Sequence, residues 1–190
     1  MDGAVKIRII NEAASLFGSK GYRNVTLSEL ATRLGMSKKT LYQYFSGKED
    51  IAEAVLDLTL DAIAAGIAER MQRAGSSDPL QTLTLSFEHI KTEIVRLHPL
   101  FLEDMQKYVP PLWMKLEVFR SRQLTFLEQL LTQAMQAGRI RQVDTRLVTA
   151  IMLECIQHIV QPEFAAKQQA PLMQVADTLF SLFLDGLRID

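Results

Sequence analysis

Apolar residues recur at intervals of three and four along almost the whole chain, the spacing that places side chains on one face of an α-helix. From residue 5 to 18 this stripe consists of Ile9, Ile10, Ala13, Leu16 and Phe17. No stretch shows the apolar–polar alternation of a strand. Further stripes, separated by glycine, proline or capping residues, predict helices at 27–34, 38–45, 48–73, 79–97, 100–109, 111–137, 144–160 and 171–187. The sequence therefore predicts an all-α chain of about nine helices.

Two short helices joined by a tight turn are predicted directly after the first helix. Thr26 is a good N-cap for the first of them, and Glu29, three residues later, completes a capping box. Gly35 ends this helix, because glycine enters the left-handed conformation at little cost, and Ser37 caps the next one. With the first helix they form a compact three-helix head, whose predicted core is Ile10, Ala13, Phe17, Leu30, Leu34, Leu41 and Phe45.

The second helix of this pair has two different faces. Leu41 and Phe45 point inward together, whereas Lys39, Thr40 and Gln43 occupy the opposite side. A short helix with an apolar inner face and a basic, hydrogen-bonding outer face suits the major groove of DNA. We expect Lys39, Thr40 and Gln43 to approach base edges. The side chains expected mainly to hold phosphates and set the register are Thr26, Ser37, Lys38, Tyr42, Tyr44 and Lys48.

The segment GMSKKTLYQYFSGKEDI resembles the helix-turn-helix signature of the tetracycline-repressor-like (TetR-like) transcription regulators, and LFGSKGYRNVTLSELA before it is also similar. The resemblance covers roughly residues 5 to 55. It implies a DNA-binding head over residues 1–47, a ligand-binding and dimerisation body over residues 48–190, and a double-stranded DNA operator as partner. The positions that match the family pattern are Gly35, Met36, Ser37, Thr40, Leu41, Tyr42, Phe45 and Lys48.

The two parts differ in charge, although the whole chain carries a net charge of −1. Residues 1–48 hold eight basic and three acidic side chains, a net charge of +5, and the remainder holds 13 basic and 19 acidic side chains, a net charge of −6. A basic head on an acidic body directs one end of the molecule toward a polyanion. This favours DNA binding over the alternative, a helical protein-interaction module with no DNA target, because protein interfaces tend to be depleted in lysine.

A long helix over residues 48–73 is predicted to join the head to the body as a semi-rigid rod. At ~1.5 Å per residue it is roughly 35 Å long. The segment AGSSDP that follows is the linker-like stretch of the chain, and Asp78 with Pro79 supplies the cap and first turn of the next helix.

The last two predicted helices are more apolar than one chain of this size can easily cover. Residues 171–187 are apolar on nearly all sides. The helix before them has a predicted core stripe of Leu147, Ile151, Cys155 and His158, and beyond it carries the apolar residues Val148, Ile151, Met152, Ile156 and Ile159. Two copies could pair these helices into a four-helix bundle about a two-fold axis. The TetR-like resemblance implies such a homodimer, and ordinary core burial is the alternative. A dimer spaces its recognition helices by about one DNA turn or a small multiple, which predicts a palindromic operator.

The middle of the body is rich in methionine and aromatic residues. Methionine adapts to irregular shapes and is common at promiscuous apolar sites, and polar side-chain tips can orient a ligand in such a site. The resemblance implies a mostly apolar small-molecule effector that releases a repressor from its operator. Plain core packing is the alternative. The expected effector contacts are Phe87, Phe101, Met105, Trp113, Phe119 and His158.

Catalytic and metal-binding patterns are not found in the sequence. It contains no phosphate-binding loop, GxGxxG, HExxH or CxxC, so we expect neither an enzyme nor a cofactor, and an all-α enzyme remains a third interpretation. Glu154 and His158 are four residues apart, but two ligands do not make a metal site. Cys155 is the single cysteine, and we expect it to be a buried, inert side chain.

There is no signal peptide and no apolar run of about 18 residues, so we expect a cytoplasmic protein without a membrane span.

Overall fold

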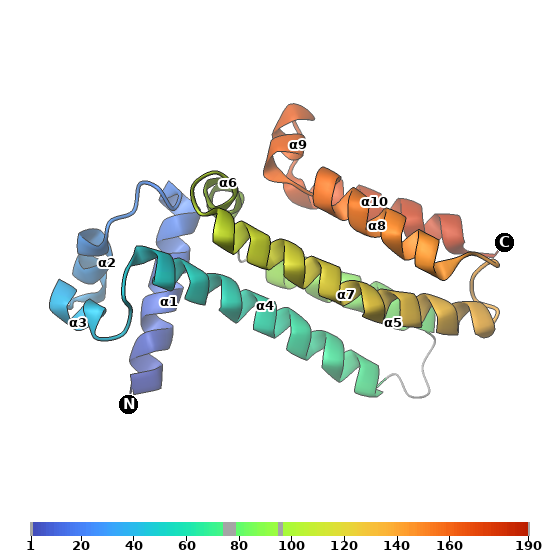
Figure 1. Ribbon diagram of the computed structural model, residues 1–190, viewed down its shortest axis with the longest axis horizontal. Helices are drawn as coiled ribbons and strands as arrows, with labels where there is room; N and C mark the ends of the chain where they lie inside the picture. Colours follow the sequence, from blue (N-terminus) through green and yellow to red (C-terminus); the bar gives the residue numbers. More distant parts are fainter. Residues whose placement is uncertain (1, 74–78, 95–96, 190) are drawn as a thin grey trace. The chain divides into compact units, whose positions relative to one another are not determined.

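The structure, a computed structural model, describes residues 2–73, 79–94 and 97–189 (Figure 1). Within these ranges the chain forms ten α-helices and one isolated β-bridge, between Ile140 and Arg188. The all-α prediction is confirmed. The helices are α1 (Asp2–Lys20), α2 (Leu27–Leu34), α3 (Lys38–Tyr42), α4 (Lys48–Arg73), α5 (Pro79–Ile94), α6 (Pro99–Tyr108), α7 (Pro110–Gln136), α8 (Thr145–Ile159), α9 (Pro162–Lys167) and α10 (Leu172–Leu187).

The helix that the sequence did not predict is α9. The sequence pattern indicated a break at Pro162, but proline is well tolerated at the first position of a helix, and α9 begins there. The predicted linker before Pro79, including the cap Asp78, lies outside the described residues.

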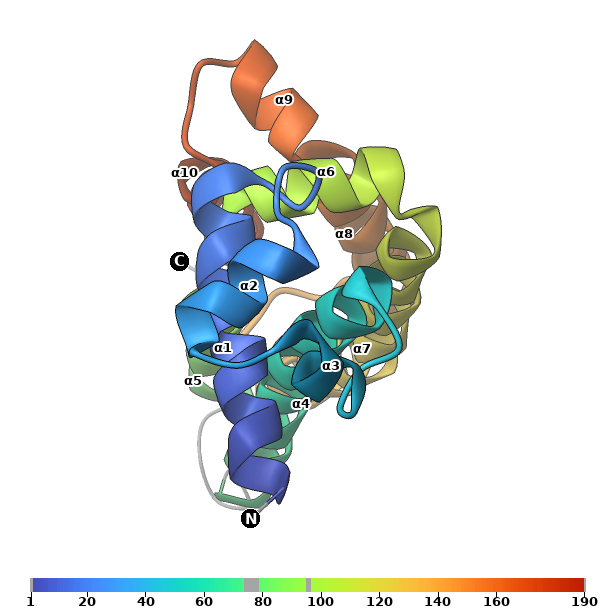
Figure 2. The same cartoon turned by 90° about the vertical axis from the view of Figure 1, so that its left-hand side faces the viewer.

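Helices α1, α2 and α3 form the three-helix head, which faces the viewer in Figure 2. Every residue predicted for its core is buried, and the most exposed of them, Ile10, retains 6 % of its surface. Thr26 Oγ1 accepts a hydrogen bond from the backbone N–H of Glu29 at 3.2 Å, while the Glu29 carboxylate pairs with the Lys20 ammonium. The core and the Thr26 cap are therefore as predicted, whereas the Glu29 side chain that was expected to complete a capping box pairs with Lys20 instead.

Gly35 occupies the turn between α2 and α3 in a left-handed conformation, with φ 65° and ψ 31°. A Cβ added there meets no atom within 4 Å, so the Gly35→Ala substitution carries only a conformational cost. We expect it to lower the free energy of unfolding by about 1–2 kcal/mol, measured by urea denaturation. Gly47→Ala is the matched control, because its Cβ also meets nothing and its φ is not in the left-handed region. An equal loss in both variants would contradict this account.

The chain divides into two compact units, which we describe separately. The first comprises Met1–Asp61 and Ile94–Leu116, and the second comprises Ala62–Glu93 and Glu117–Asp190. The first unit is thus larger than the predicted head, because α6 packs on α1, where Phe101 stacks on Phe17 with ring centroids 5.2 Å apart. The functional division between residues 47 and 48 remains a prediction.

The second unit is a helical bundle in which α8 packs against α9 and α10. Phe87 of α5 stacks on Phe180 of α10 at 4.3 Å between ring centroids. Helices α4 and α5 come close at Gly66, where an added Cβ would lie 1.9 Å from His89 Nε2. The buried core of this unit includes Leu83, Phe87, Leu127, Leu130, Leu131, Ala134, Ile140, Met152 and Leu187.

Candidate DNA-binding surface

The recognition helix α3 is shorter than the sequence predicted. It ends at Tyr42, and Gln43 is its C-cap. The chain continues in a tight turn, because the carbonyl of Leu41 accepts the backbone N–H groups of both Tyr44 and Phe45, at 3.0 and 3.1 Å. This turn brings Phe45 back to the core while keeping the residues before it at the surface.

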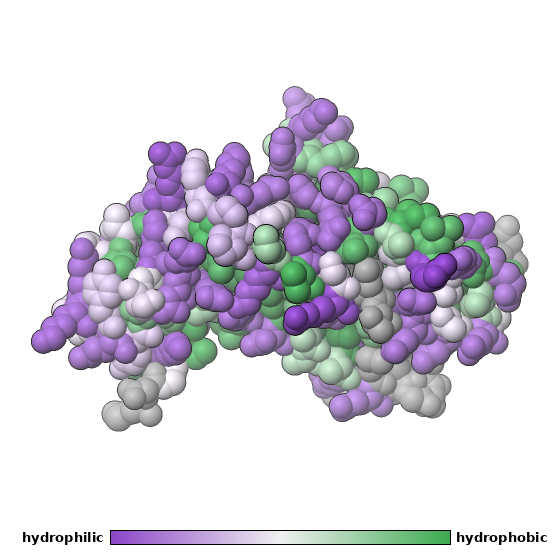
Figure 3. Space-filling model, viewed as in Figure 1, coloured by the Kyte–Doolittle hydropathy of each residue, from purple (hydrophilic) through white to green (hydrophobic). Residues whose placement is uncertain are grey.

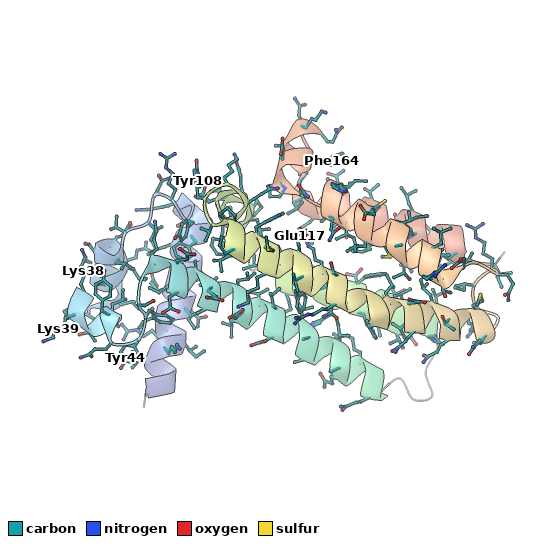
Figure 4. The ribbon with its side chains drawn as sticks, viewed as in Figure 1. Lys38, Lys39, Tyr44, Tyr108, Glu117 and Phe164 are labelled. Atoms are coloured by element: carbon teal, nitrogen blue, oxygen red, sulfur yellow. The ribbon has the colours of Figure 1, made fainter. Side chains whose placement is uncertain are left out.

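The two faces of α3 are separated as predicted. Leu41 is fully buried and Phe45 is 3 % exposed, so the apolar side faces the head. Lys38, Lys39 and Gln43 are exposed, and Figure 4 shows the two lysines projecting from the helix. The aromatic ring of Tyr42 is 53 % exposed, whereas Thr40 and Tyr44 are half-buried. The exposed face therefore offers cations, an amide and a phenol together.

The hydroxyl groups at the start of α3 bind each other and the helix. Ser37 Oγ accepts the backbone N–H of Thr40 at 3.0 Å and lies 2.9 Å from Thr40 Oγ1. Ser37 is therefore a helix cap, as the sequence predicted. The base contact expected for Thr40 has to compete with its hydrogen bond to Ser37.

The ammonium group of Lys48, which the sequence predicted to hold a phosphate, makes hydrogen bonds within the protein. Its Nζ donates to the carbonyls of Tyr22 and Val25 at 3.0 Å each, and lies 3.4 Å from that of Arg23. It also sits 4.3 Å from the centroid of the Tyr22 ring. Burial lowers the pKa of the Lys48 ammonium from its usual value, an effect that the charge of Asp104 opposes. With its donors directed at the α1–α2 loop, Lys48 holds this loop in place, and the phosphate contact predicted for it has to compete with these hydrogen bonds.

The same loop is held from α6, by residues that the sequence prediction missed. Asp104 Oδ2 accepts the backbone N–H of Arg23 at 2.9 Å, and Arg23 Nη1 donates to Tyr108 Oη at 3.2 Å. A Cβ on Gly21 would lie 2.6 Å from Asp104 Oδ2, and its φ is 78°, so only glycine fits. These partners are 81 and 85 residues apart in sequence, so no local pattern could have predicted them.

Two basic residues of α1 also brace the helix-turn-helix, and spacing alone gave no sign of it. Arg8 Nη2 donates to the carbonyl of Leu34 at 2.6 Å, at the C-terminal end of α2. Lys6 Nζ lies 5.1 Å from the centroid of the Phe45 ring. Part of the positive charge counted in the head therefore serves to hold α2 and α3 on α1.

The comparisons with known proteins agree with this geometry. The sequence profile of the family described as "Bacterial regulatory proteins, tetR family" matches residues 9–55. The uncharacterized HTH-type transcriptional regulator YvaF of Bacillus subtilis (strain 168) is 26 % identical over 183 residues, covering 96 % of this chain and 95 % of YvaF. The crystal structure of a TetR family transcriptional regulator, PfmR of Thermus thermophilus, superposes with a TM-score of 0.66 at 26 % identity, covering 96 % of this chain and 100 % of PfmR.

The chain is a TetR-like transcriptional regulator. It binds DNA, and these comparisons do not support the alternative of a module with no DNA target. A further relative, the fatty acid metabolism regulator protein of B. subtilis (strain 168), is 22 % identical over 185 residues, covering 95 % of this chain and 94 % of that protein. These relatives are named as regulators rather than enzymes.

The effector contacts expected for this TetR-like regulator are divided between its two units. Phe101, Met105 and Trp113 belong to the first unit, and Phe87, Phe119 and His158 belong to the second.

Several of these residues have other roles in the structure. Phe101 and Met105 are 1 % and 0 % exposed, because α6 uses them to pack on α1. The His158 imidazole is 74 % exposed and lies 3.3 Å from the Glu154 carboxylate. The structure therefore assigns Phe101 and Met105 to the core and His158 to the surface.

The apolar stripe of α8 that was predicted to face the core lies at the surface. Leu147 and Ile151 are 57 % and 47 % exposed, and Cys155 is half-buried rather than buried. Met152 and Thr149 form the inward face of this helix instead. An exposed apolar stripe on one copy is the arrangement that a second copy would cover.

The described residues also bear on membrane insertion and metal binding. No helix in these ranges combines the length and the apolar character that a membrane span requires. The same ranges contain no group of three or more histidine, cysteine or acidic residues placed to hold a metal ion.

Proposed function

We propose that this regulator is a homodimeric repressor that binds a palindromic operator and leaves it when a small, mostly apolar effector binds to the body. The observation that carries the proposal is the outer face of α3, where exposed Lys38, Lys39 and Gln43 lie opposite the buried Leu41. Cations hold phosphates, and a glutamine amide can pair with adenine in the major groove. We propose that it acts in the cytoplasm, where such an operator is accessible.

The dimer is proposed to form through α8 and α10. These helices pack together, and their outer sides carry Leu147, Ile151 and Leu182, the last with 68 % of its surface exposed. Hydrophobic side chains gather on the surface over these helices (Figure 3). Burying them against the same surface of a second copy removes apolar area from water, which is the main driving force of association.

Control by the effector is proposed to act through the α1–α2 loop. Lys48 of α4 and Asp104 of α6 both bind this loop, which leads directly into α2. A tilt of either helix therefore changes the position of the helix-turn-helix. Support for an effector comes from the regulators that the chain resembles, one of which is named for fatty acid metabolism.

Selection from random DNA duplexes tests the proposed function. The full-length protein is expected to enrich a palindrome, and binding to it should weaken steeply with salt because phosphate contacts release counterions. Failure to enrich any sequence, or binding that is independent of salt, would contradict the proposal.

Replacing Gln43 with alanine is expected to relax the preference for one base in each half-site. A bidentate glutamine–adenine contact contributes about 1–3 kcal/mol of discrimination, so the preferred base should lose roughly a factor of 5 to 150 over its competitors. The measurement is a competition assay with single-base operator variants. The control is Gln168→Ala, an exposed glutamine outside the head. A base profile identical to the unsubstituted protein would rule out this role for Gln43.

A further inference from the structure

A partly buried ion pair lies on α7 inside the second unit. Arg120 Nη1 donates to Glu117 Oε1 at 2.8 Å, and the two side chains are only 13 % and 22 % exposed. Burial lowers the pKa of the Arg120 guanidinium from its usual value, and the Glu117 charge opposes this shift. Removing two charges from water costs more than a single such contact usually returns, so the pair is weak as a stabilising device. A role in binding would explain its position better.

The second oxygen of the Glu117 carboxylate strengthens this argument. Glu117 Oε2 is inaccessible to solvent and has no hydrogen-bond partner in the described part of the protein. A buried acceptor without a donor loses the hydrogen bonds it made to water, and the loss is larger when it is charged, so such atoms are rare in native proteins. The atom therefore requires a donor that the described residues do not supply.

Further polar groups lie one turn along α7 and on the neighbouring helix. Ser121 Oγ donates to the Glu117 carbonyl at 2.9 Å, and Gln157 Nε2 of α8 lies 3.5 Å from Ser121 Oγ. Helices α7 and α8 thus meet at this level through polar side chains. Figure 4 marks Glu117 on α7, and all four residues belong to the second unit. Ser121 and its contact with Gln157 are exposed, so the polar groups extend from the partly buried Glu117 to the surface of the bundle.

The charges of the site indicate which ligand it accepts. Glu117 already neutralises the Arg120 guanidinium, and a carboxylate ligand would bring a second negative charge against Glu117 Oε2 without supplying the donor that this atom lacks. A hydroxyl or ammonium group would instead donate to Glu117 Oε2 and keep the existing pair. Water can fill this place in the free protein, and a ligand that displaces the water must bring a donor of its own.

We propose that Glu117, oriented by Arg120, is the polar anchor of the effector site, and that the effector is an apolar molecule carrying a hydroxyl or amino donor rather than a free carboxylate. This inference rests on the proposed function, which supplies the effector. It adds the chemical class of the ligand and the atom that recognises it.

Isothermal titration calorimetry of the full-length protein with three probes of equal chain length tests the proposal. The probes are 1-decanol, decylamine and decanoate. The unsubstituted protein is expected to bind the two donors at least about tenfold more tightly than decanoate, because a hydrogen bond to a buried charge is worth about 1.5–3 kcal/mol. Glu117→Ala removes the acceptor, so the preference for the two donors over decanoate should be lost. Glu128→Ala, a carboxylate elsewhere on α7, is the control and should keep the original order.

A double variant covers the case in which Glu117→Ala does not fold. Glu117→Ala/Arg120→Leu removes both charges, and its affinities for the three probes should lie within about threefold of one another. Decanoate as the tightest probe of the unsubstituted protein, an order unchanged by these substitutions, or no detectable binding of any probe would overturn the proposal.

Operator binding, measured on the same preparations, separates this result from the proposed function. Its loss would count against DNA recognition, whereas intact operator binding with the wrong probe order rejects only the anchor.

Discussion

Replacing Leu182 with glutamate is expected to convert the dimer to monomers and to abolish tight operator binding. Leu182 is 68 % exposed on α10 of a single copy, so the carboxylate costs the isolated fold little. In a two-fold interface each copy would bury one added carboxylate. A buried unpaired charge costs at least about 3 kcal/mol, which weakens association by roughly 100-fold or more. Sedimentation equilibrium measures the dimer, and fluorescence anisotropy measures its binding to the operator.

The matched control for this variant is Leu85→Glu on α5. Leu85 is also an exposed leucine of the second unit, at 49 %, but it lies outside α8 and α10. This variant should remain dimeric with unchanged operator affinity. A dimeric Leu182→Glu protein would place the interface elsewhere, and a monomeric Leu85→Glu protein would make both results non-specific.

Replacing Lys48 with methionine is expected to destabilise the first unit without altering the salt dependence of DNA binding. The substitution keeps the aliphatic stem but leaves the carbonyls of Tyr22 and Val25 without their donor. Hydrogen bonds to a charged group contribute about 1.5–3 kcal/mol each, and partial exposure of this site reduces the sum, so we expect a loss of about 2–3 kcal/mol. Urea denaturation and operator titrations at several salt concentrations measure the two quantities.

Lys38→Met separates the structural role from a phosphate contact. Lys38 is exposed at the start of α3, so its substitution should leave stability unchanged and reduce the slope of log K against log salt by about 0.9, the effect of one phosphate. The opposite pattern, with a reduced slope for Lys48→Met and unchanged stability, would restore the phosphate role that the sequence predicted for Lys48.

The head could be predicted from sequence because its determinants are local. The caps at Thr26 and Ser37, the left-handed Gly35 and the three-four spacing of the core all act within a few residues, and the structure contains each of them. The hydrogen bonds of Lys48 could not be predicted for the opposite reason. Its partners, Tyr22 and Val25, are 26 and 23 residues away, and spacing does not reveal which carbonyls lie within reach of an ammonium.

The body was harder to predict, because its helices have apolar residues on more than one side. On α8 the stripe through Leu147 and Ile151 looked like core, but it is the exposed side, whereas Met152 is buried. Periodicity identifies a helical face without saying what covers it. The polar site at Glu117 and Arg120 was missed for a related reason. An acidic and a basic residue three apart on a helix usually form a solvated surface pair, and only the structure shows these two side chains to be mostly shielded from solvent.

The packing of α6 on α1 has a consequence for building chimeric regulators. A chimera that exchanges residues 1–47 between two such proteins would separate Phe17 from Phe101 and the α1–α2 loop from Asp104. The transplanted segment would then carry an uncovered aromatic ring and a loop without its anchors. An exchange that includes Ile94–Leu116 with the N-terminal residues follows the compact unit instead. The segment that carries the DNA-binding surface is therefore discontinuous in sequence, and its exchange requires three crossover points.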